Sequence, residues 1–318
     1  MIHAGRRLGR RGPEVTRLGL GTAPLGNLFS TVTDADAQAT VGAAWDAGIR
    51  FFDTAPLYGH GLAEDRLGRA LSGRPRDEYV VATKVGRLLR PPSGVRGPTI
   101  FADVADLEPV FAYSRDDTLR SIEDSLERLG LDRLDVVHVH DPDDHEAEAM
   151  SGAFPALIEL RDQGVIGAVG AGMNQWQMLD RFVQRVDLDC VLLAGRYTLL
   201  DRSGADVLLP RCEEQSVGVV IGGVFNSGLL ADPDANRTYD YVPASESLRA
   251  RAQELGEIAR VGGVTLRAAA LQFAMAHPAV TAVVVGARTA QEVHDDVDDA
   301  DVVIPPSLGA QLGFFSPP

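Results

Sequence analysis

Short apolar segments alternate along the chain with longer stretches in which apolar and charged residues recur every three or four positions. The short segments are almost wholly apolar and rich in valine, as in YVVATKVG and VTAVVVGA. Strands buried on both faces have this pattern, because a strand with one solvated face would alternate. Eight segments predict such strands, at 17–26, 49–55, 79–86, 134–140, 166–173, 189–197, 217–225 and 280–287.

The amphipathic stretches between these segments predict helices. The stretch 34–48 follows Thr33, and 116–130 follows Ser114, with Asp117 three residues later and Gly130 at its end. A hydroxyl before a helix caps its first N–H groups, and glycine often ends a helix. Further helices are expected at 154–164, 175–184, 206–215, 247–260, 265–277 and 289–299.

The regular alternation of strand and helix predicts an α/β fold with a parallel sheet. Eight such units fit a closed (β/α)8 TIM barrel, formed by residues 1–318 as a single domain with an extra helix before the last strand and with loop insertions. An open doubly wound sheet is the alternative, but it would carry a complete glycine-rich dinucleotide fingerprint. GLGTAPLG has Pro24 where the third glycine belongs. The Pro/Gly-rich segment 87–110 is expected to be a lid or a substrate loop.

Composition narrows the possible functions. The chain has 30 Lys and Arg against 45 Asp and Glu, a formal charge of −15, so binding to nucleic acid or to an anionic membrane surface is not expected. The two cysteines, Cys190 and Cys212, form no CxxC motif, which fits a reducing cytoplasm. The basic N-terminus is followed by no apolar stretch, so no secretory signal is predicted, and no apolar run is long enough to span a bilayer.

Four polar residues follow the predicted strands at the end where a TIM barrel places its active site. The second strand leads to Asp53 and Tyr58, the third contains Lys84, and the fourth ends at His140. A nearby ammonium is expected to lower the pKa of the phenol, and a carboxylate would hold that ammonium in place. The tyrosine could then exchange a proton with a carbonyl or hydroxyl oxygen that the imidazole orients.

The stretch VVHVHDPDDHE (136–146) raises a metal site as the alternative reading. His138 and His140 are two residues apart on a strand and therefore share a face. The remaining histidines are scattered along the chain, however, so one loop would have to supply every ligand. We therefore expect no metal, with His138 in the barrel interior and the acidic residues after His140 in a solvated loop.

The motifs FFDTAPLYGHGLAEDRLGRAL, VVATKVG, LDVVHVHDPD and VVVGARTAQEV together resemble the aldo-keto reductase superfamily over residues 16–300. The resemblance implies a TIM barrel that binds NAD or NADP without a Rossmann domain. It also implies a catalytic tetrad with Tyr58 as general acid or base, Lys84 as its tuner, Asp53 as the partner of the lysine, and His140 as the ligand of the substrate oxygen.

The same resemblance implies a set of cofactor-binding residues, with some departures from the family pattern. Asn174 would hold the nicotinamide carboxamide, while Ala194 stands where the family often has glutamine. Gly222 occupies the position of the aromatic residue that stacks on the nicotinamide, and Phe225 is a possible substitute. The cofactor-binding residues expected are Gly21, Thr22, Asp53, Asn174, Phe225, Asn226, Ser227, Gly228, Leu230, Gly286, Arg288, Glu292 and Asp296. The loop 226–230 would approach the pyrophosphate through its backbone N–H groups.

The adenosine end favours NAD. The family's phosphate-binding arginine is replaced by Glu292, and its usual asparagine by Asp296. A carboxylate repels a 2′-phosphate and accepts a hydrogen bond from a ribose hydroxyl. Arg288 argues the other way, so NADP stays open.

The stretches RYTLLD, GAGMNQW and FNSGLL look most like the aldose 1-dehydrogenase branch, which includes L-fucose and D-threo-aldose dehydrogenases and has pyridoxal 4-dehydrogenase as a near relative. The implied reaction is oxidation of a sugar hemiacetal to a lactone. Tyr58 and His140 would contact the substrate, together with Trp176 and Phe101, although helix packing explains Trp176 equally well.

Three other functions stay open at this point. They are an NADPH-dependent reductase of aldehydes and ketones, a cofactor-binding regulatory subunit of the kind that serves channels, and a metal hydrolase. The partner expected is a small molecule, and the chain is expected to be a monomer or a small homo-oligomer.

Overall fold

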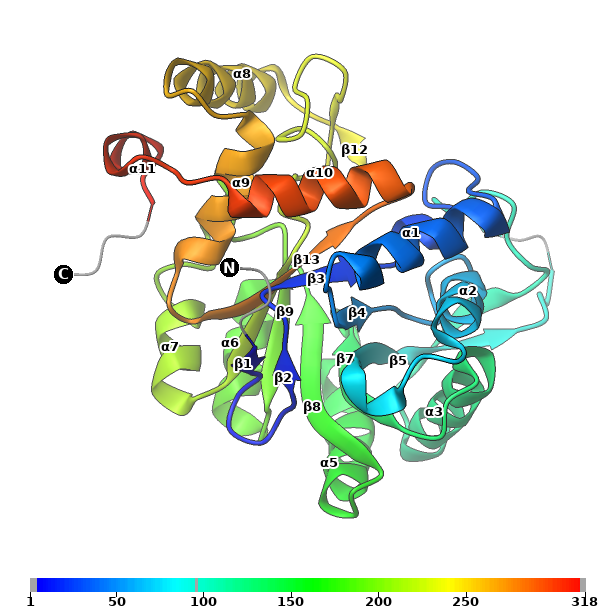
Figure 1. Ribbon diagram of the computed structural model, residues 1–318. Coiled ribbons are helices and arrows are strands. Elements are labelled where there is room, and N and C mark those ends of the chain that lie inside the picture. The colour runs from blue at the N-terminus through cyan, green and yellow to red at the C-terminus, as the bar shows by residue number, and fades with distance from the viewer. Residues whose placement is uncertain (1–4, 95–96, 315–318) are drawn as a thin grey trace.

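Eight parallel strands close into a barrel in the computed structural model, which describes residues 5–94 and 97–314 (Figure 1). The strands pair in the order β4-β3-β13-β10-β9-β8-β7-β5, and pairing of β4 with β5 completes the ring. The barrel strands are β3 (Leu18–Gly21), β4 (Phe51–Asp53), β5 (Val80–Arg90), β7 (Leu134–His140), β8 (Ile166–Met173), β9 (Cys190–Ala194), β10 (Gly218–Gly222) and β13 (Val280–Gly286). The TIM barrel predicted from the sequence is confirmed.

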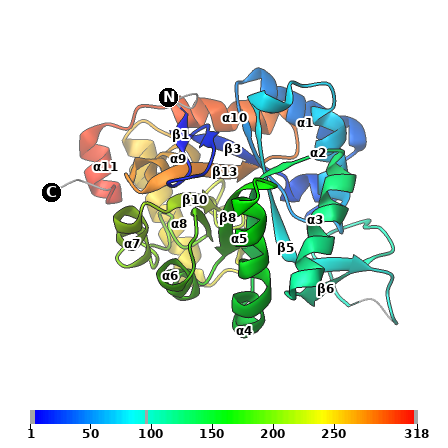
Figure 2. The same ribbon diagram turned by 90° about the horizontal axis from the view of Figure 1, so that it is seen from below.

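Helices surround the strands, and in Figure 2 helices α2, α3, α5, α6 and α7 follow one another around the outside. The surrounding helices are α1 (Asp34–Asp46), α2 (Leu62–Leu71), α3 (Arg115–Leu129), α5 (Phe154–Asp162), α6 (Trp176–Arg185), α7 (Leu208–Gln215), α9 (Leu266–Ala276) and α10 (Ala290–Asp301). The two predicted caps are present, since the Thr33 and Ser114 hydroxyls accept hydrogen bonds from the N–H groups three residues later. Within the described ranges, no helix is both long and apolar enough to cross a membrane.

Several elements lie outside the eight repeated units. The extra helix expected before the last strand is α8 (Glu246–Val261). The tail forms α11 (Pro306–Leu312), and Arg202 donates to the carbonyl oxygens of Leu312 and Gly313, at 2.6 and 2.9 Å. Short turns are η1 (Ala23–Gly26), η2 (Arg76–Glu78), α4 (Glu146–Glu148) and η3 (Ala149–Ala153), and a small hairpin is formed by β11 (Thr238–Tyr239) and β12 (Val242–Pro243).

The segment 87–110 is more regular than its composition suggests. β5 extends beyond the barrel to Arg90 and pairs antiparallel with β6 (Glu108–Ala112), with Leu88 opposite Val110. The expectation of one long loop was therefore wrong at both ends. Leu88 is buried, which explains the pairing, and the proline- and glycine-rich composition is confined to the stretch between the two strands. Residues 95–96 lie outside the described residues.

Apolar side chains form two layers, as expected for strands buried on both faces. The larger cluster lies between strands and helices. The smaller one fills the barrel interior and includes Phe51, Ala82, Val136, Cys190 and Val220. Two residues from the N-terminal segment, Leu8 and Val15, also belong to the interior cluster and are almost completely buried.

The N-terminal segment is a hairpin that closes one end of the barrel. β1 (Arg6–Arg7) pairs antiparallel with β2 (Glu14–Val15), and Leu8 is fully buried. Gly218, the first residue of β10, abuts the hairpin, since a Cβ there would lie 2.6 Å from the Gly9 nitrogen. The hairpin therefore covers the amino-terminal ends of the strands, opposite the predicted active site.

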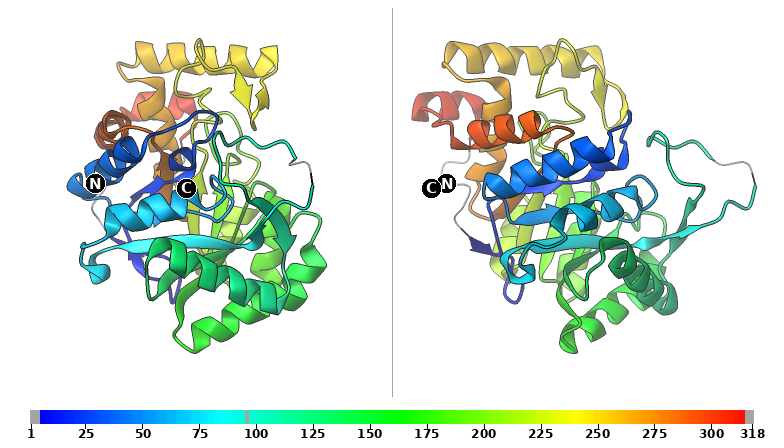
Figure 3. Two further views of the ribbon diagram at one scale, coloured as in Figure 1. Left: turned by 90° about the vertical axis from the view of Figure 1, so that its right-hand side faces the viewer. Right: turned by 45° about the vertical axis from the view of Figure 1, so that its right-hand side comes forward.

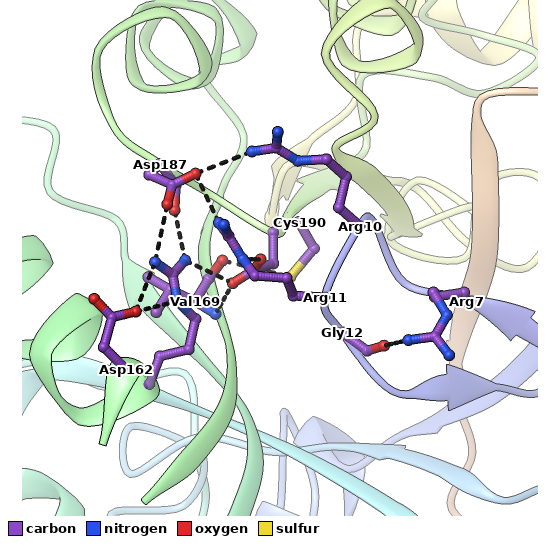
Figure 4. Close-up of polar contacts among 10 residues, drawn as sticks. Arg7, Arg10, Arg11, Gly12, Asp162, Val169, Asp187 and Cys190 are labelled. Carbon is purple, nitrogen blue, oxygen red and sulfur yellow. Dashed lines mark hydrogen bonds and ion pairs between the residues drawn. The ribbon is translucent and has the colours of Figure 1, made fainter. Parts of the chain in front are cut away.

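A network of charged residues fixes the hairpin to the strand that follows α6 (Figure 4). The Asp189 side chain is fully buried, and its carboxylate accepts from Arg11 Nε at 2.9 Å and from Arg161 Nη1 at 3.0 Å. A third hydrogen bond comes from the Val169 N–H at 2.9 Å. The neighbouring Asp187 also pairs with Arg10 and Arg11 but has a side chain that is 45% exposed. Asp189 is therefore the central anion of this network.

We predict that Asp189→Asn lowers the free energy of unfolding by about 3 kcal/mol, because the buried guanidinium of Arg161 and the partly exposed one of Arg11 lose their shared buried anion. The matched control is Asp187→Asn, which should cost less than about 1 kcal/mol because its ion pairs are exposed. Urea unfolding measures both changes as shifts of the midpoint at constant m-value. Equal losses in the two variants would contradict the central role of Asp189.

Candidate active site

The four polar strand-end residues are brought together inside the barrel mouth. Lys84 Nζ donates to both carboxylate oxygens of Asp53, at 2.9 and 2.8 Å, and to the Thr54 carbonyl oxygen at 2.7 Å. It also lies 4.8 Å from the centroid of the Tyr58 ring. The rings of Tyr58 and His140 meet edge to face, with centroids 6.0 Å apart. An ammonium, a carboxylate, a phenol and an imidazole thus share one site.

Strand geometry explains this convergence. Side chains alternate along a strand, so residues two apart share a face. Ala82 and Val136 lie in the barrel interior, and therefore Lys84 and His140 on the same strands also point inward. Asp53 follows the interior residue Phe51 by two positions, on the strand next to that of Lys84.

Tyr58 lies in the loop after β4, which packs closely against η1. A Cβ on Gly59 would lie 2.4 Å from the Gly26 carbonyl oxygen, and Gly59 has a φ of +63°. Only glycine tolerates both conditions. The Tyr58 N–H also donates to the Ala55 carbonyl oxygen at 3.0 Å. The backbone at Tyr58 is therefore held in place by close contact with η1, in the loop that follows β3.

The expected electrostatic tuning of Tyr58 is wrong for this structure. Burial raises the pKa of Tyr58 well above 10, and the Asp53 carboxylate raises it further. Lys84 directs its three hydrogen bonds to Asp53 and Thr54 rather than to the phenol oxygen. Burial likewise holds the pKa of His140 well below 6.5, with a further decrease from the charge of Lys84. The site therefore contains a protonated phenol beside a neutral imidazole.

Two residues that the sequence did not indicate hold the backbone at His140. The Tyr113 hydroxyl donates to the carbonyl oxygens of His140 and Asp141, at 2.7 and 2.8 Å, and Arg87 Nη1 donates to the His140 carbonyl at 2.9 Å. The Tyr113 ring fits against Gly86, where a Cβ would lie 2.3 Å from a ring carbon. The signal in the sequence is weak, since Tyr113 directly follows β6, a strand that the Pro/Gly-rich composition of 87–110 did not predict.

Asp141 also belongs to the site, although the sequence placed it in a solvated loop. Its carboxylate lies 3.4 Å from His140 Nε2 and 3.8 Å from Arg87 Nη2. Burial raises its pKa to about 6. The rest of this loop is also more ordered than expected, because His145 stacks on Tyr113 and Glu146 pairs with Arg181.

His138 lies in the barrel interior, as the sequence predicted, on β7 directly opposite Lys84 on β5. It is fully buried, and burial together with the charge of Lys84 lowers its pKa to about 3. Its ring nitrogens have no hydrogen-bond partner among the described residues. No group of three or more His, Cys, Asp or Glu side chains in the described ranges could hold a metal ion.

The residues expected to hold the nicotinamide half of a dinucleotide line one side of this mouth. The Thr22 hydroxyl and the Asn226 amide oxygen are buried and lack a hydrogen-bond partner among the described residues. The Asn226 amide nitrogen donates to the Gly195 carbonyl, at 3.2 Å, and a Cβ on Gly195 would lie 3.9 Å from the Asn174 amide nitrogen. Buried oxygens without a hydrogen-bond partner, next to a glycine that leaves the backbone accessible, fit a polar ligand that approaches the backbone closely.

The loop 226–230 differs in part from expectation. The N–H groups of Asn226, Gly228 and Leu230 donate to the backbone carbonyl oxygens of Gly223 and Phe225, so they are already used within the loop. Leu230 is fully buried. The Leu229 N–H is used in the same way, so only the Ser227 N–H and the side chains of this loop remain for the expected contact with a phosphate. The unpaired Asn226 oxygen accepts hydrogen bonds and therefore suits a ligand donor such as an amide or a hydroxyl.

Phe225 has a contact that the sequence did not indicate. The guanidinium of Arg267 lies over its ring, 5.0 Å from the centroid, and Arg267 Nη2 also donates to Asp296 at 2.7 Å. Phe225 is thus linked through Arg267 to a residue expected at the adenosine end, and its stacking on a nicotinamide stays a prediction. Arg267 itself was missed, since an arginine in an otherwise apolar helix gives no distinct signal.

Arg288, the second arginine at the adenosine end, also donates its hydrogen bonds to other residues of the protein. Arg288 donates to the Ser30 hydroxyl at 2.6 Å and to the Leu28 carbonyl at 2.7 Å. The Glu292 carboxylate accepts from the Arg288 backbone N–H at 2.7 Å. Burial raises the pKa of Asp296 to about 7, although the charge of Arg267 opposes this. Glu292 thus contacts Arg288, and Asp296 contacts Arg267, but the Arg288 guanidinium already donates to acceptors within the protein.

The two candidate substrate residues have different surroundings. Phe101 is buried, and its ring centroid lies 6.3 Å from that of Tyr58. Trp176 begins α6 and packs against the core between strands and helices. The geometry therefore supports a place beside Tyr58 for Phe101, whereas contact of Trp176 with a substrate stays a prediction.

Comparison with known proteins identifies the family of the chain. Residues 17–310 match the Aldo/keto reductase family. The chain is 43% identical to D-threo-aldose 1-dehydrogenase from Pseudomonas sp over 95% of its length and 94% of that protein. It is 42% identical to pyridoxal 4-dehydrogenase from Microbacterium luteolum over 92% of its length and 91% of that protein.

A solved structure agrees with the sequence comparisons. The holo form of the aldo-keto reductase AKR11C1 from Bacillus halodurans superimposes with a TM-score of 0.76 and 27% identity, covering 97% of this chain and 94% of that one. The match extends across the whole barrel, including the strand ends that hold the buried Lys84–Asp53 pair. The chain therefore belongs to the aldo/keto reductase family and is an NAD(P)-dependent oxidoreductase that acts on CH–OH groups.

Proposed function

We propose that this protein is an NAD-dependent aldose 1-dehydrogenase that oxidises the C1 hydroxyl of a cyclic sugar to a lactone. The observation that carries the proposal is the buried Lys84–Asp53 pair beside Tyr58 and His140. The substrate class is supported by the 43% identity to a D-threo-aldose 1-dehydrogenase along nearly the full length. L-fucose and related pyranoses are the sugars we would expect.

Each residue of the site has a part in this reaction. A bound nicotinamide would supply the hydride acceptor for C1 and the hydride donor in the reverse direction, and Thr22, Asn174 and Asn226 would hold it. Tyr58 takes the hydroxyl proton during oxidation and gives it to the carbonyl oxygen during reduction. Neutral His140 orients that oxygen by a hydrogen bond. Lys84, balanced by Asp53, packs beneath the phenol ring and holds it in place.

The preference for NAD follows from the charges at the adenosine end. The family pattern puts a phosphate-binding arginine where this chain has Glu292, and a carboxylate there would repel the 2′-phosphate of NADP. Arg288, which could have offset this charge, binds Ser30 and Leu28 instead. Arg267 is occupied by Asp296 and Asp299. The guanidinium groups of both arginines in this region are therefore already bound to other residues of the protein.

Pyridoxal 4-dehydrogenase activity is the second candidate, favoured by the 42% identity to such an enzyme over most of both chains. The chemistry at Tyr58 would be the same, because pyridoxal also presents a cyclic hemiacetal hydroxyl. The NADPH-dependent reduction of simple aldehydes is a third possibility, which the arrangement at Glu292 disfavours. We also propose the cytoplasm as the location, supported by two buried free thiols, Cys190 and Cys212.

We predict that Tyr58→Phe lowers kcat for sugar oxidation by about 100-fold to 10,000-fold, because the proton acceptor is lost while the ring is kept. Initial rates would be measured with NAD and NADP separately, using L-fucose, D-arabinose, L-galactose and pyridoxal. The Kd for NADH, from fluorescence titration, should be unchanged. Wild-type NADPH oxidation with simple aldehydes, and no oxidation of any of these alcohols, would refute the dehydrogenase proposal.

We predict opposite pH profiles for the two directions. The raised pKa of Tyr58 leaves little phenolate at neutral pH, so oxidation should become faster from pH 7 to pH 10. Reduction uses the protonated phenol, which is fully present, and should vary little between pH 7 and pH 9. Since the pKa of His140 is lowered well below 6.5, imidazolium formation should not affect either profile in this window. An oxidation rate that is already constant above pH 7 would contradict the assignment.

We predict that Glu292→Gln raises kcat/KM for NADP about 10-fold relative to NAD, since removal of one repulsive charge near a phosphate contributes about 1.4 kcal/mol. The amide keeps an acceptor for the Arg288 N–H. The matched control is Asp295→Asn, which removes an exposed charge from the same helix and should change the ratio less than about 2-fold. A wild type that already prefers NADP, or equal effects of both variants, would contradict the prediction.

A further inference from the structure

Two aromatic rings from distant parts of the chain meet at the rim above the site. The ring centroids of Phe29 and Tyr241 are 5.7 Å apart. Both side chains are about half exposed, at 49% and 55%. Figure 3 shows the β11–β12 hairpin next to the loop that precedes α1. Exposed apolar side chains gathered at the mouth of a site mark a surface that a ligand covers.

The backbone at Tyr241 is strained. Asp240 and Tyr241 form the two-residue turn between β11 and β12, with φ values of +49° and +65°. Such hairpin turns prefer Asn or Asp followed by glycine, because both positions need positive φ. A tyrosine in the glycine position is unfavourable, and strain of this kind is retained mainly where function requires the side chain.

The hairpin is anchored through groups other than the Tyr241 ring. Arg196 donates to both carboxylate oxygens of Asp240, at 3.1 and 2.5 Å. The Tyr241 N–H donates to the Ser227 hydroxyl at 3.2 Å, and the Thr238 hydroxyl donates to the Ser227 carbonyl at 3.3 Å. The ring is therefore not needed to hold the hairpin in place, which leaves it available to a ligand.

The loop that carries Phe29 is also held from several sides. The Phe29 N–H donates to the Ile100 carbonyl at 2.8 Å, and Leu28 forms an isolated antiparallel bridge with Phe101. Arg288 binds the carbonyl of Leu28, as described above. Phe29 has a φ of +64°, so this second ring is likewise presented from a strained but fixed backbone.

The two rings are close to the reacting groups. The turn that carries Tyr241 reaches this end of the barrel, since a Cβ on Gly195, directly after β9, would lie 3.8 Å from Asp240 Oδ1 and 3.9 Å from the Asn174 amide nitrogen. Phe101 connects the two regions, because it contacts the ring of Tyr58 and bridges to Leu28 beside Phe29. Aromatic surface therefore extends from Tyr58 to the rim on one side of the mouth.

We propose that Phe29 and Tyr241 are specificity residues that pack against the ring of a cyclic substrate while its reactive carbon lies at Tyr58. An aromatic wall offers favourable contact to the C–H face of a pyranose or to a pyridine ring, and little to a short acyclic aldehyde. The site is accordingly selective for cyclic over acyclic compounds. This inference rests on the proposed function only for the identity of the natural substrate.

The test compares Tyr241→Gly with Tyr241→Phe in the reduction of pyridine-4-carbaldehyde and of methylglyoxal by NADH. Glycine relieves the turn and removes the ring, so a loss of activity cannot be attributed to an unfolded hairpin. We expect KM for the cyclic aldehyde to rise about 10-fold with little change in kcat, and kcat/KM for methylglyoxal to change less than about 3-fold. Tyr241→Phe should behave like the wild type.

Two controls separate this proposal from its alternatives. Val303→Ala removes an exposed apolar side chain that is 78% exposed after α10 and should alter nothing. The Kd for NADH should be the same in every variant. A weaker Kd for NADH in Tyr241→Gly would assign the rings to the cofactor and overturn the proposal, as would equal losses with both aldehydes or no loss with either.

Calorimetric titration of pyridine-4-carbaldehyde into the NAD-bound protein provides a measure of binding that needs no turnover. The Kd should rise about 10-fold in Tyr241→Gly and stay unchanged in Tyr241→Phe. If the wild type oxidises neither sugars nor pyridoxal, the proposed function fails, whereas this titration still decides the role of Tyr241. An unchanged Kd in Tyr241→Gly would overturn the inference.

Discussion

The buried ion pair between Lys84 and Asp53 is the interaction on which the site depends. Both side chains are almost completely buried, and an ammonium in such a place is tolerated only when it is paired and fully hydrogen-bonded. Asp53 and the Thr54 carbonyl meet this requirement. The pair also spans β4 and β5, whose pairing closes the barrel. The group that supports the phenol is therefore also located where the ring of strands is completed.

The residues at the strand ends could be predicted from the sequence, whereas the pKa values of their side chains could not. Val-rich segments locate the strands, and the parallel fold then brings Asp53, Lys84 and His140 to one mouth. The pKa of Tyr58 depends on burial and on where Lys84 directs its hydrogen bonds, and neither is a property of sequence spacing. The contact of Tyr113 with the His140 backbone joins residues 27 positions apart through an irregular insertion, which no periodic pattern indicates.

Irregular backbone is concentrated at the catalytic end of the barrel. Among the described non-glycine residues with positive φ, all except Ser216 follow the carboxyl end of a barrel strand: Asn27, Phe29, His60, Asp103, Asp141, Asn226, Ser227, Asp240 and Tyr241. The sequence located the expected cofactor residues in loops at this end but could not predict their contacts. Arg288 and Arg267, for example, donate hydrogen bonds to other residues of the protein. The regular strands thus set the position of the catalytic residues, and the strained loops form the surface around them.

The opposite end of the barrel has a consequence for the conditions in which this enzyme can work. Hydrogen bonds donated to Asp187 and Asp189 raise the pKa of Arg11, and the same two carboxylates overcome the effect of burial on the pKa of Arg161. The cations that fasten the N-terminal hairpin therefore stay charged in alkaline solution. Alkalinity, which favours proton removal by Tyr58, leaves this fastening intact. Proton exchange at Tyr58 and the ion pairs of Arg11 and Arg161 thus lie at opposite ends of the barrel, so that alkaline solution acts on the first without releasing the second.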